Sequence, residues 1–564
     1  MAEQTRTFDV ASETTSQQIK TIVQNIQNNG VSGGGGSVSA IVVTPTADMV
    51  GETMTLSLED GETLTKEIES TSKVIFKASY IGVYTLSCGT HETSVTVTNL
   101  GEIVYATWGC IINVTFTASE AIGLTLTATK GSNSVTATVG SDKKATFNLD
   151  SAGTWDVMGR KVTLSQLGNT VNITEDIYGY NWTMTESNPD NAITYPSTVT
   201  NANFDNIGTR GSDAEIDLGD WETFRDDFLE CRPVMLNFDG TVAYELNHDN
   251  QNYKLDGSTA SDISDSSKSM NAMVEFPKRY IKRWTSGSVA YFRISRMKLD
   301  SSYKAYPWMY GTNEASAFEN DAIYLPMFEG SSVSSKVRSI AGQTPMNTNA
   351  GATEYTQITA LGTGWQFDDW ADKSMITDFM FMMGKSTNVQ THHGNGHYSG
   401  GSGASSLLTT GGTKAYGSNY GGNGNSYMKF LWLENYYGDR WDRTFGVWYI
   451  SSVLYVKMFP PYTTDGTVAN YTNLNRAISG TSGGYISEVT YDENGMIPKT
   501  VSGSDSTYVP DGCWFSNGTR FLLWGAHCSA GLRVGAAFDV DLDFSYSNWN
   551  IGPSPAYKNT QQAA

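Results

Sequence analysis

An internal repeat near the N-terminus restricts the fold of this chain more than any other feature of its sequence. The segment VIFKASYIGVYTLSC at residues 74–88 aligns with ATFNLDSAGTWDVMG at residues 145–159. Three pairs of aromatic or glycine positions share a spacing of 71 residues: Phe76 with Phe147, Gly82 with Gly153, and Tyr84 with Trp155. This repeat predicts two consecutive copies of one small fold.

Residues 38 to about 175 carry the alternating pattern of β-strands. Runs such as VTVT at 95–98 and TLTAT at 125–129 alternate apolar and polar side chains. Alternation that is broken by turn residues at short intervals is typical of antiparallel sandwiches. We therefore expect two immunoglobulin-like sandwiches, at residues 37–99 and 100–177, which serve either as spacers or as surface-adhesion domains. A sandwich fold alone carries no functional information, so we favour the spacer.

The length and charge of the chain limit its class. With 564 residues it is too long for one hydrophobic core, so we expect about three or four domains. Its net charge is −21, from 37 Lys and Arg against 58 Asp and Glu, which disfavours binding to nucleic acid. The sequence has no run of eighteen apolar residues, so we expect no membrane insertion.

The N-terminus and the cysteines indicate where the protein folds. The opening MAEQTRTFDV lacks the apolar core of a signal peptide. The cysteines form neither an even disulfide framework nor a C-x-x-C zinc pair: Cys88, Cys110, Cys231, Cys513 and Cys528. We expect the chain to fold in a cytoplasm and to leave by another route, such as release within a virus particle.

Residues 1–36 are expected to form an attachment or oligomerisation segment. Four apolar side chains recur at helical spacing: Ile19, Ile22, Val23 and Ile26. Asn28-Asn29-Gly30 and the run Gly33 to Gly36 then end the pattern. Because a helix this short is marginal alone in water, we expect it in a small oligomeric bundle or docked on another protein. The alternative is a frayed tail.

The composition changes at about residue 178. Trp, Met and Tyr become more frequent, and a glycine-rich loop extends from Gly394 to Gly424. A loop of this length inside a compact domain is often functional. We predict few helices, the clearest from Trp221 to Cys231, ahead of a β-rich remainder.

Several motifs after residue 178 resemble one superfamily. Three segments resemble the opening of phage tail and fibre tip domains of the formylglycine-generating-enzyme-like, C-type-lectin superfamily: CRPVMLNFDGTVAYELN at 231–247, YKLDGS at 253–258 and MVEFPKRYIKRW at 273–284. The preceding segment, TESNPDNAITYP at 185–196, resembles the usual lead-in to that domain. LWLENYYGDRWDRTFGVWY at 431–449 resembles the core motif of that superfamily, in which Glu-Asn precedes Gly-Asn-x-Trp; here Asp439 replaces the Asn. The resemblance implies a C-type-lectin-like α+β domain at residues 178–564.

The end of the chain, at residues 512–557, resembles the variable regions of phage tropism determinants that retroelements diversify. In those proteins fixed Gly, Trp and aliphatic positions hold scattered substitutable ones, and the fixed positions here would be Gly518, Trp524, Gly525, Gly531, Gly535, Phe538 and the terminal SNWNIGPSPA. The candidate receptor-binding residues are Trp514, Phe515, Ser516, Phe521, Trp524, His527, Ser529, Arg533, Asp539, Asp541, Asp543 and Tyr546.

The chemistry of this segment also favours a binding surface. In AAFDVDLDF at 536–544, apolar residues alternate with aspartates, so we expect the apolar set in the core and the aspartates on one exposed face. Exposed aromatic side chains with Arg are typical of binding hot spots, which favours Phe521, Arg533 and Tyr546. The alternative for the aspartates is the polar face of an ordinary edge strand.

The sequence lacks the main catalytic patterns. Formylglycine-generating enzymes use a close cysteine pair, whereas Cys513 and Cys528 are 15 residues apart. The Glu-Pro-Asn and Gln-Pro-Asp loops of calcium-dependent lectins are missing, although Asp541 and Asp543 leave calcium open. There is no G-x-x-x-x-G-K-[ST] or H-E-x-x-H motif. We expect no enzymatic activity and no cofactor; the enzymatic alternative is a glycoside-hydrolase carboxylate pair.

Three of the six histidines lie close together in the sequence: His392, His393 and His397. At helical spacing they could ligate zinc or iron, and in a trimeric fibre such histidines can meet on the symmetry axis. The surrounding glycines argue against a helix, so we expect a solvated loop, with a metal site as the alternative.

These features together predict a bacteriophage virion protein, a tail fibre or tip exposed on the virion surface. Its N-terminal segment would attach to other virion proteins, and its C-terminal domain would bind a host surface protein or glycan. We expect a homotrimer, from the resemblance and because Ile19, Ile22 and Ile26 need partners. The alternative is a capsid decoration or head fibre protein whose domains adhere to glycans or mucus.

Overall fold

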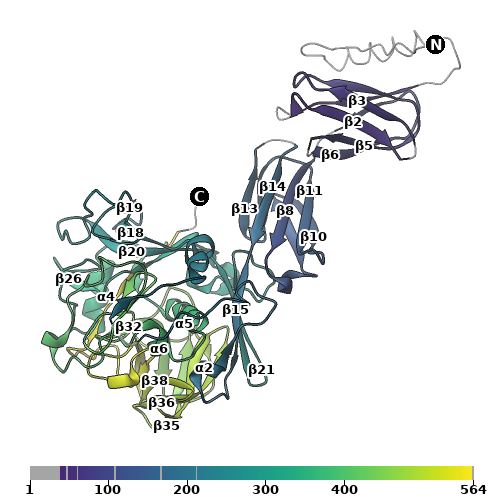
Figure 1. The fold of residues 1–564 in the computed structure, drawn as a ribbon. Coiled ribbons are helices and arrows are strands. Elements are labelled where there is room, and N and C mark those ends of the chain that lie inside the picture. The colour runs from purple at the N-terminus through teal and green to yellow at the C-terminus, as the bar shows by residue number, and fades with distance from the viewer. Residues whose placement is uncertain are drawn as a thin grey trace, which may run out of the picture. The chain divides into compact units, whose positions relative to one another are not determined.

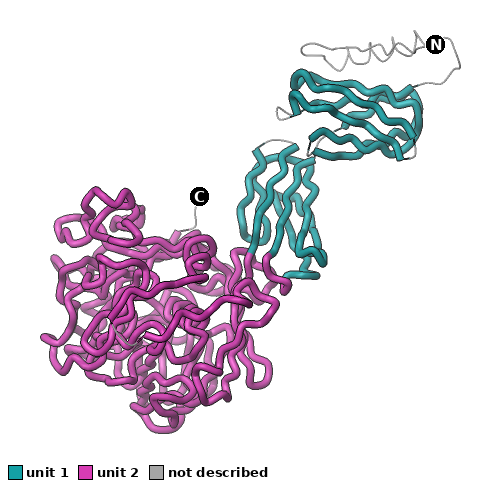
Figure 2. Tube along the Cα trace, viewed as in Figure 1, with its two compact units in different colours: residues 1–116, 121–175 teal, residues 117–120, 176–564 magenta. Residues whose placement is uncertain are grey.

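The computed structural model describes residues 38–45, 49–59, 61–89, 91–106, 109–165, 168–210 and 213–561. The mainly β, multidomain architecture predicted from the sequence is confirmed (Figure 1). The chain divides into unit 1, residues 1–116 and 121–175, and unit 2, residues 117–120 and 176–564 (Figure 2). The predicted oligomerisation residues Ile19, Ile22, Val23 and Ile26 lie outside the described residues. Within the described ranges, no helix is long and apolar enough to cross a membrane.

The first half of unit 1 is a sandwich of two sheets with the strand orders β4-β1-β7 and β3-β2-β5-β6. Its strands are β1 Ser39–Val43, β2 Thr53–Leu58, β3 Thr63–Glu67, β4 Val74–Ala78, β5 Gly82–Cys88, β6 His91–Val97 and β7 Ile103–Ala106. A single core joins the two sheets, with Ile41 and Phe76 from one sheet and Leu56 and Tyr84 from the other.

The second half of unit 1 repeats this arrangement. Its sheets have the orders β11-β8-β14 and β10-β9-β12-β13, which are the orders of the first sandwich with every strand number raised by seven. The strands are β8 Cys110–Phe116, β9 Thr125–Lys130, β10 Asn133–Thr138, β11 Lys144–Leu149, β12 Gly153–Val157, β13 Arg160–Leu164 and β14 Thr170–Glu175. The internal repeat in the sequence therefore corresponds to two copies of one strand topology.

The repeated aromatic residues have the same role in both sandwiches. The Tyr84 hydroxyl donates a hydrogen bond to the Tyr80 carbonyl over 3.1 Å, and the Trp155 indole N–H donates to the Ser151 carbonyl over 3.0 Å. Each large side chain is fully buried and satisfies its one polar group on the carbonyl four residues earlier. A buried aromatic ring needs such a partner for its polar tip, which explains why the repeat retains these positions.

The repeated glycines begin equivalent strands. Gly82 has a φ of +153° and Gly153 a φ of +115°, values that side chains with a Cβ rarely adopt. Each glycine lies two residues before the buried aromatic residue, so it sets the direction in which β5 and β12 leave their turns.

Unit 2 is built on several sheets. A four-stranded sheet has the order β16-β15-β22-β21, from β15 Ile177–Thr183, β16 Ile193–Thr194, β21 Tyr280–Ser286 and β22 Val289–Ser295. A six-stranded sheet has the order β19-β18-β20-β25-β42-β28. Its strands are β18 Arg232–Asn237, β19 Val242–Glu245, β20 Met270–Pro277, β25 Ala322–Pro326, β28 Trp365–Phe367 and β42 Pro555–Tyr557. The C-terminal strand β42 thus lies inside this sheet.

The largest sheet of unit 2 is formed by strands that lie between Trp441 and Gly552. Its order is β34-β33-β32-β39-β40-β38-β36-β37-β35, and β41 also pairs with β32. The strands are β32 Trp441–Ile450, β33 Val453–Val456, β34 Thr472–Asn473, β35 Ser479–Gly480, β36 Gly484–Asp492, β37 Gly495–Gly503, β38 Val509–Phe515, β39 Thr519–Trp524, β40 Phe538–Val540 and β41 Ile551–Gly552. Within the segment at 512–557, β39, β40 and the end of β38 are therefore inner strands of this sheet, whereas β42 belongs to the six-stranded sheet.

The helix α5, Trp370–Gly384, has every residue buried. A capping box begins it: the Asp369 side chain accepts from the Asp372 backbone N–H, and the Asp372 side chain accepts from the Asp369 N–H. Such reciprocal bonds satisfy two otherwise unpaired donors. Sequence periodicity did not predict this helix, because a helix buried on all sides has no polar face.

A second helix, α4 Gly351–Thr359, precedes α5, and the short helices α2 Pro189–Ala192 and α6 Val389–His393 flank other loops. The helix predicted at Trp221 to Cys231 is present as α3, Trp221–Thr223, continued by a π-helical segment at Phe224–Leu229. The segment from Gly394 to Gly424 is largely irregular, as predicted, with one short 3-10 turn at Ala404–Ser406.

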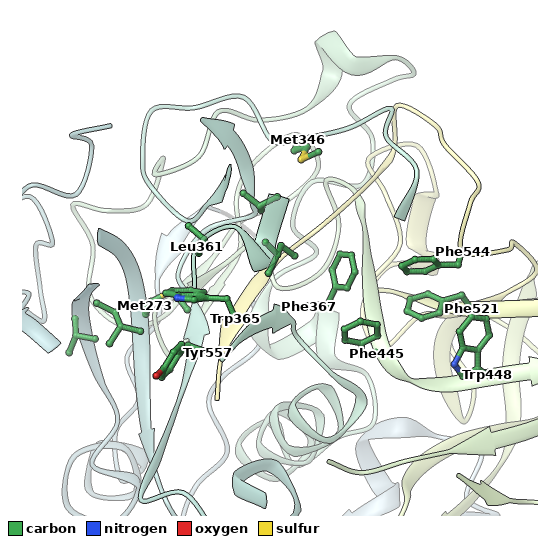
Figure 3. Close-up of a cluster of buried hydrophobic side chains, with 14 of the residues drawn as sticks. Met273, Met346, Leu361, Trp365, Phe367, Phe445, Trp448, Phe521, Phe544 and Tyr557 are labelled. Atoms are coloured by element: carbon green, nitrogen blue, oxygen red, sulfur yellow. The ribbon is translucent and has the colours of Figure 1, made fainter. Parts of the chain in front are cut away.

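One hydrophobic cluster of unit 2 contains a predicted receptor-binding residue (Figure 3). The ring of Phe521 lies 4.8 Å from that of Phe544 and 5.0 Å from that of Trp448, centre to centre. Its side chain is only 1% exposed. The expected exposure of Phe521 is therefore wrong, because β39 is an inner strand of the largest sheet and Phe521 faces the core.

Two further candidate receptor-binding residues are buried for the same reason, and for Trp524 this agrees with its assignment as a fixed position. Trp524, at the end of β39, is 2% exposed and packs on the Trp370 ring of α5 at 5.6 Å. Asp539 is 4% exposed, because β40 lies between β38 and β39 and is covered on both faces. The strand ends at Val540, so the alternation expected over 536–544 applies to only part of that segment; Asp543 is exposed.

Candidate binding surface

Four aromatic side chains gather at one end of the largest sheet, and we call this group the aromatic face: Trp441, Trp514, His527 and Trp549. Trp441 is at the start of β32 and Trp514 is in β38, and their rings meet edge to face at 5.2 Å. The His527 ring lies 6.2 Å from Trp441 and 5.8 Å from Trp549. Trp514, His527 and Trp549 are partly exposed, so the face combines rigid packing with access from solvent.

Polar groups border the aromatic face. The Arg533 guanidinium lies 5.9 Å from the Trp514 ring centre, within the range of a cation–π contact. The Ser529 hydroxyl lies 3.0 Å from His527 Nδ1, and Ser529 is exposed. Leu532, beside Arg533, is 38% exposed. Tryptophan rings with a neighbouring Arg are the side chains in which binding hot spots are enriched.

Two glycines make room for Trp514. A Cβ placed on Gly512 would lie 2.3 Å from the Trp514 ring and 2.8 Å from Arg533 Cβ, and one on Gly483 would lie 3.1 Å from the indole nitrogen. The first two distances are shorter than packing allows, and the third is shorter than most Cβ contacts. The Trp514 ring is therefore fixed against bare backbone, which positions it before any partner arrives and lowers the entropy cost of binding.

His527 is neutral in this surface. Its Nδ1 accepts a hydrogen bond from the Ser529 backbone N–H over 3.3 Å, so the ring proton is on Nε2. Burial lowers the pKa of His527 to about 4. At neutral pH the aromatic face thus presents an uncharged imidazole, with Arg533 as its adjacent cation.

The remaining predicted residues lie elsewhere in the segment. Tyr546 is 39% exposed, whereas Phe515 and Ser516 are partly exposed at the end of β38 and after it. Ser516 donates to the Asp541 carbonyl over 2.9 Å. Asp543 accepts from the Ser545 backbone N–H, so its carboxylate closes a local turn. The structure therefore unites Trp514, His527, Ser529 and Arg533, and leaves the other predicted positions outside the aromatic face.

Sequence reasoning missed two members of the aromatic face. Trp441 lies in the superfamily core motif, whose residues are expected to be structural. Trp549 lies in the terminal SNWNIGPSPA, which the resemblance to variable regions assigns to the fixed positions. The parallel pairing of Trp441 with Ile551 brings both segments together. That pairing joins residues over 100 positions apart, which local pattern cannot reveal.

Three histidines have separate partners. His392 Nδ1 contacts the Ile207 carbonyl, and His393 Nε2 contacts the Met380 carbonyl, each at 2.9 Å. His397 Nδ1 contacts Asp439 at 2.5 Å. All are at most 4% exposed, so the expected solvated loop is wrong for these side chains, and they cannot meet on an exposed symmetry axis. Among the described residues, no group of three His, Cys, Asp or Glu side chains is arranged to hold a metal.

Asp439, the residue that departs from the superfamily motif, has a structural role. Its backbone φ is +49°, a left-handed conformation that Asp and Asn tolerate better than most residues. Its Oδ1 accepts from the Leu408 backbone N–H over 2.9 Å and contacts His397. Asp439 thereby ties the glycine-rich loop to the turn before β32, next to Trp441 of the aromatic face.

Asp511, beside the aromatic face in β38, gives a pH-dependent prediction. Burial raises its pKa to about 8, against hydrogen bonds from the Ala536 N–H and Gln390 that lower it. Between about pH 4 and pH 8 the Asp511 carboxyl group is therefore protonated in the folded state and ionised in the unfolded chain. Because the folded state binds the extra proton, the free energy of unfolding falls as the pH rises through this range. We expect the stability of the parent relative to Asp511→Asn to fall by up to about 1.4 kcal/mol per pH unit in that window.

Denaturant unfolding of both proteins at pH 5 and pH 8 measures this difference. If the difference in the free energy of unfolding between the parent and Asp511→Asn were the same at both pH values, Asp511 would be ionised in the folded state.

Comparison with known proteins adds little to this geometry. No protein-family model and no curated protein matches the chain. Among solved structures, the TIE protein of Bacillus anthracis has 10% identity and a TM-score of 0.11, over 44% of this chain and 46% of that one. A streptococcal ancillary pilin has 10% identity and a TM-score of 0.09, over 24% and 62%. A 1.5-MDa bacterial ice-binding adhesin has 14% identity and a TM-score of 0.08, over 24% and 66%.

This chain thus covers less than two thirds of each of those structures. TM-scores this low define no shared fold.

Proposed function

We propose that this chain is a bacteriophage virion protein, a tail fibre or tip, that binds a receptor on the host cell surface through the aromatic face. In this proposal unit 2 is a C-type-lectin-like domain, and the two sandwiches of unit 1 are immunoglobulin-like spacers. The observation that carries the proposal is the position of Trp514, His527, Ser529 and Arg533. They come from the segment that resembles diversified variable regions, and they share one accessible surface.

The chemistry of the aromatic face supports a protein or glycan receptor. Partly exposed indole rings offer flat apolar area, Arg533 offers a fixed cation, and Ser529 and neutral His527 offer hydrogen bonds. Such a surface suits a protein loop or a glycan, both of which present apolar faces beside hydroxyl or carbonyl groups. The net charge of −21 disfavours nucleic acid as the partner. The proposal includes no catalytic step and no cofactor.

The protein assembles as a homotrimer in this proposal, attached to other virion proteins through residues 1–36. Three copies would present three aromatic faces, and linked sites bind a cell surface far more tightly than one site does. Light scattering of the full chain at micromolar concentration tests the assembly, and a monomer would contradict it.

Binding of the labelled full chain to intact bacterial cells tests the receptor-binding role. We expect saturable binding that Trp514→Ala weakens by about 2 kcal/mol or more, roughly 30-fold in Kd, because a central anchor residue is removed. Tyr253→Ala is the matched control, since Tyr253 is 38% exposed in unit 2 and is not in the aromatic face. Equal binding by Trp514→Ala and Tyr253→Ala, with both variants folded, would contradict the proposed site.

A further inference from the structure

A lysine near the C-terminus lies between two carboxyl groups in the interior of unit 2. Lys558 Nζ is 2.5 Å from Asp369 Oδ2 and 3.0 Å from Asp372 Oδ1. All three side chains are at most 1% exposed. Lys558 directly follows β42, and the two aspartates begin α5, so the contact joins segments that are 189 positions apart in the sequence.

Each of the two carboxyl groups caps the helix with one oxygen atom and contacts Lys558 with the other. Asp369 Oδ1 accepts from the Asp372 backbone N–H over 3.2 Å, and Asp372 Oδ2 accepts from the Asp369 N–H over 3.3 Å. These bonds complete the capping box of α5. The second oxygen of each residue, Asp369 Oδ2 and Asp372 Oδ1, faces the lysine amine.

We propose that Lys558 and Asp369 join as an intramolecular isopeptide bond. Lys558 Nζ attacks Asp369 Cγ, the bond from Cγ to Oδ2 breaks, and one molecule of water leaves. Asp372 takes a proton from the amine and passes it to the departing oxygen. Ammonium and carboxylate together hold the atoms of the amide plus water, so the step needs no oxidant, reductant or co-reactant.

The geometry favours this condensation in three ways. The amine and the carboxyl group are held in contact, which replaces an encounter between separate molecules. Asp372 Oδ1 is 3.0 Å from the amine, close enough to carry a proton. Burial, together with the charge of Asp369, raises the pKa of Asp372 far above the usual range. The amide keeps Asp369 Oδ1 as its carbonyl oxygen, so the helix cap is retained.

The starting state is an ion pair. Burial lowers the pKa of Lys558, but the two aspartates raise it more, and the net shift is upward. The amine must therefore lose its proton to a neighbouring carboxyl group before it attacks. Because the bond needs to form only once after folding, a slow step suffices, and exclusion of water from the site opposes the reverse hydrolysis.

A second buried lysine provides an internal comparison. Lys373 Nζ lies 2.7 Å from Asp368 and 3.0 Å from Asp442. It also lies 4.4 Å from the centre of the Tyr436 ring, a contact that stabilises the ammonium form. Asp442 is occupied by the Ser554 hydroxyl at 2.8 Å. Because of this ring contact, we expect Lys373 to remain an ammonium ion in a salt bridge.

The mass of the purified full chain tests the proposal. We expect a mass about 18 Da below that of the sequence, and a protease digest in which one branched peptide contains both Lys558 and Asp369. Lys558→Arg is expected to restore the full mass, and Asp372→Asn to prevent or greatly slow the loss. Asp369→Asn is expected to change the loss to about 17 Da, because ammonia leaves in place of water.

Lys373→Arg is the matched control and is expected to keep the loss of about 18 Da. Recovery of Lys558 and Asp369 from the folded parent protein in separate, unmodified peptides would overturn the proposal, and this result needs no variant to fold. A water loss that maps to an Asp-Gly sequence such as Asp256-Gly257, as a cyclic imide, would overturn it equally.

Discussion

Replacing Arg443 with methionine is expected to lower the free energy of unfolding of unit 2 by about 3–5 kcal/mol. Arg443 Nε lies 2.6 Å from Glu354 Oε2, and both side chains are at most 1% exposed. The same guanidinium donates to the Phe544 and Tyr546 carbonyls over 3.2 and 3.0 Å. Its loss leaves a buried carboxyl group and two carbonyls without their cation, and burial already raises the pKa of Glu354.

Urea unfolding followed by tryptophan fluorescence measures this cost. Lys499→Ala is the control in the same unit, because its ion pair with Glu488 is exposed at 54% and 55% and is expected to contribute less than about 1 kcal/mol. The double variant Arg443→Met with Glu354→Leu should recover part of the loss, since no buried charge then remains. If Arg443→Met lowered the free energy of unfolding no more than Lys499→Ala does, the buried ion pair would not have the stabilising role described here.

Replacing Phe521 with alanine is expected to cost about 3–5 kcal/mol through the cavity it leaves. The Phe521 ring packs against Phe544, Trp448 and Phe445 at 4.8–5.9 Å between ring centres. This loss is a stability effect, so the binding affinity of molecules that remain folded should be unchanged. Tyr546→Ala, at a position that is 39% exposed, should change stability by less than about 0.5 kcal/mol.

Denaturant unfolding and cell binding of both variants show whether each side chain contributes to stability or to receptor binding. If Phe521→Ala kept parent stability and lost binding, Phe521 would be a receptor contact, and its place in the core of unit 2 would be wrong.

The sandwiches of unit 1 could be predicted because their signals are local. Tyr84 and Trp155 must be buried with a partner for one polar group, and Gly82 and Gly153 must have positive φ values. Each requirement acts within a few residues, so it leaves a mark in the sequence that repeats with the fold.

The aromatic face could be predicted only in part because β38, β39 and β40 are inner strands. A strand covered on both faces buries both sets of alternating side chains, so Phe521 and Asp539 have the same sequence pattern as exposed positions. Trp514 remains accessible because it lies at the sheet end over Gly512 and Gly483. The pairing that brings Trp441 and Trp549 beside it connects distant segments, which no short window of sequence contains.

Radical footprinting of the full chain on host cells tests the central claim, that the aromatic face is the recognition surface. Trp514 and Trp284 are both partly exposed tryptophans of unit 2, and only Trp514 belongs to the face. Cell binding is predicted to protect Trp514 from oxidation and to leave Trp284 unchanged. Protection of Trp284 alone, or of neither residue on cells that bind the protein, would contradict the claim.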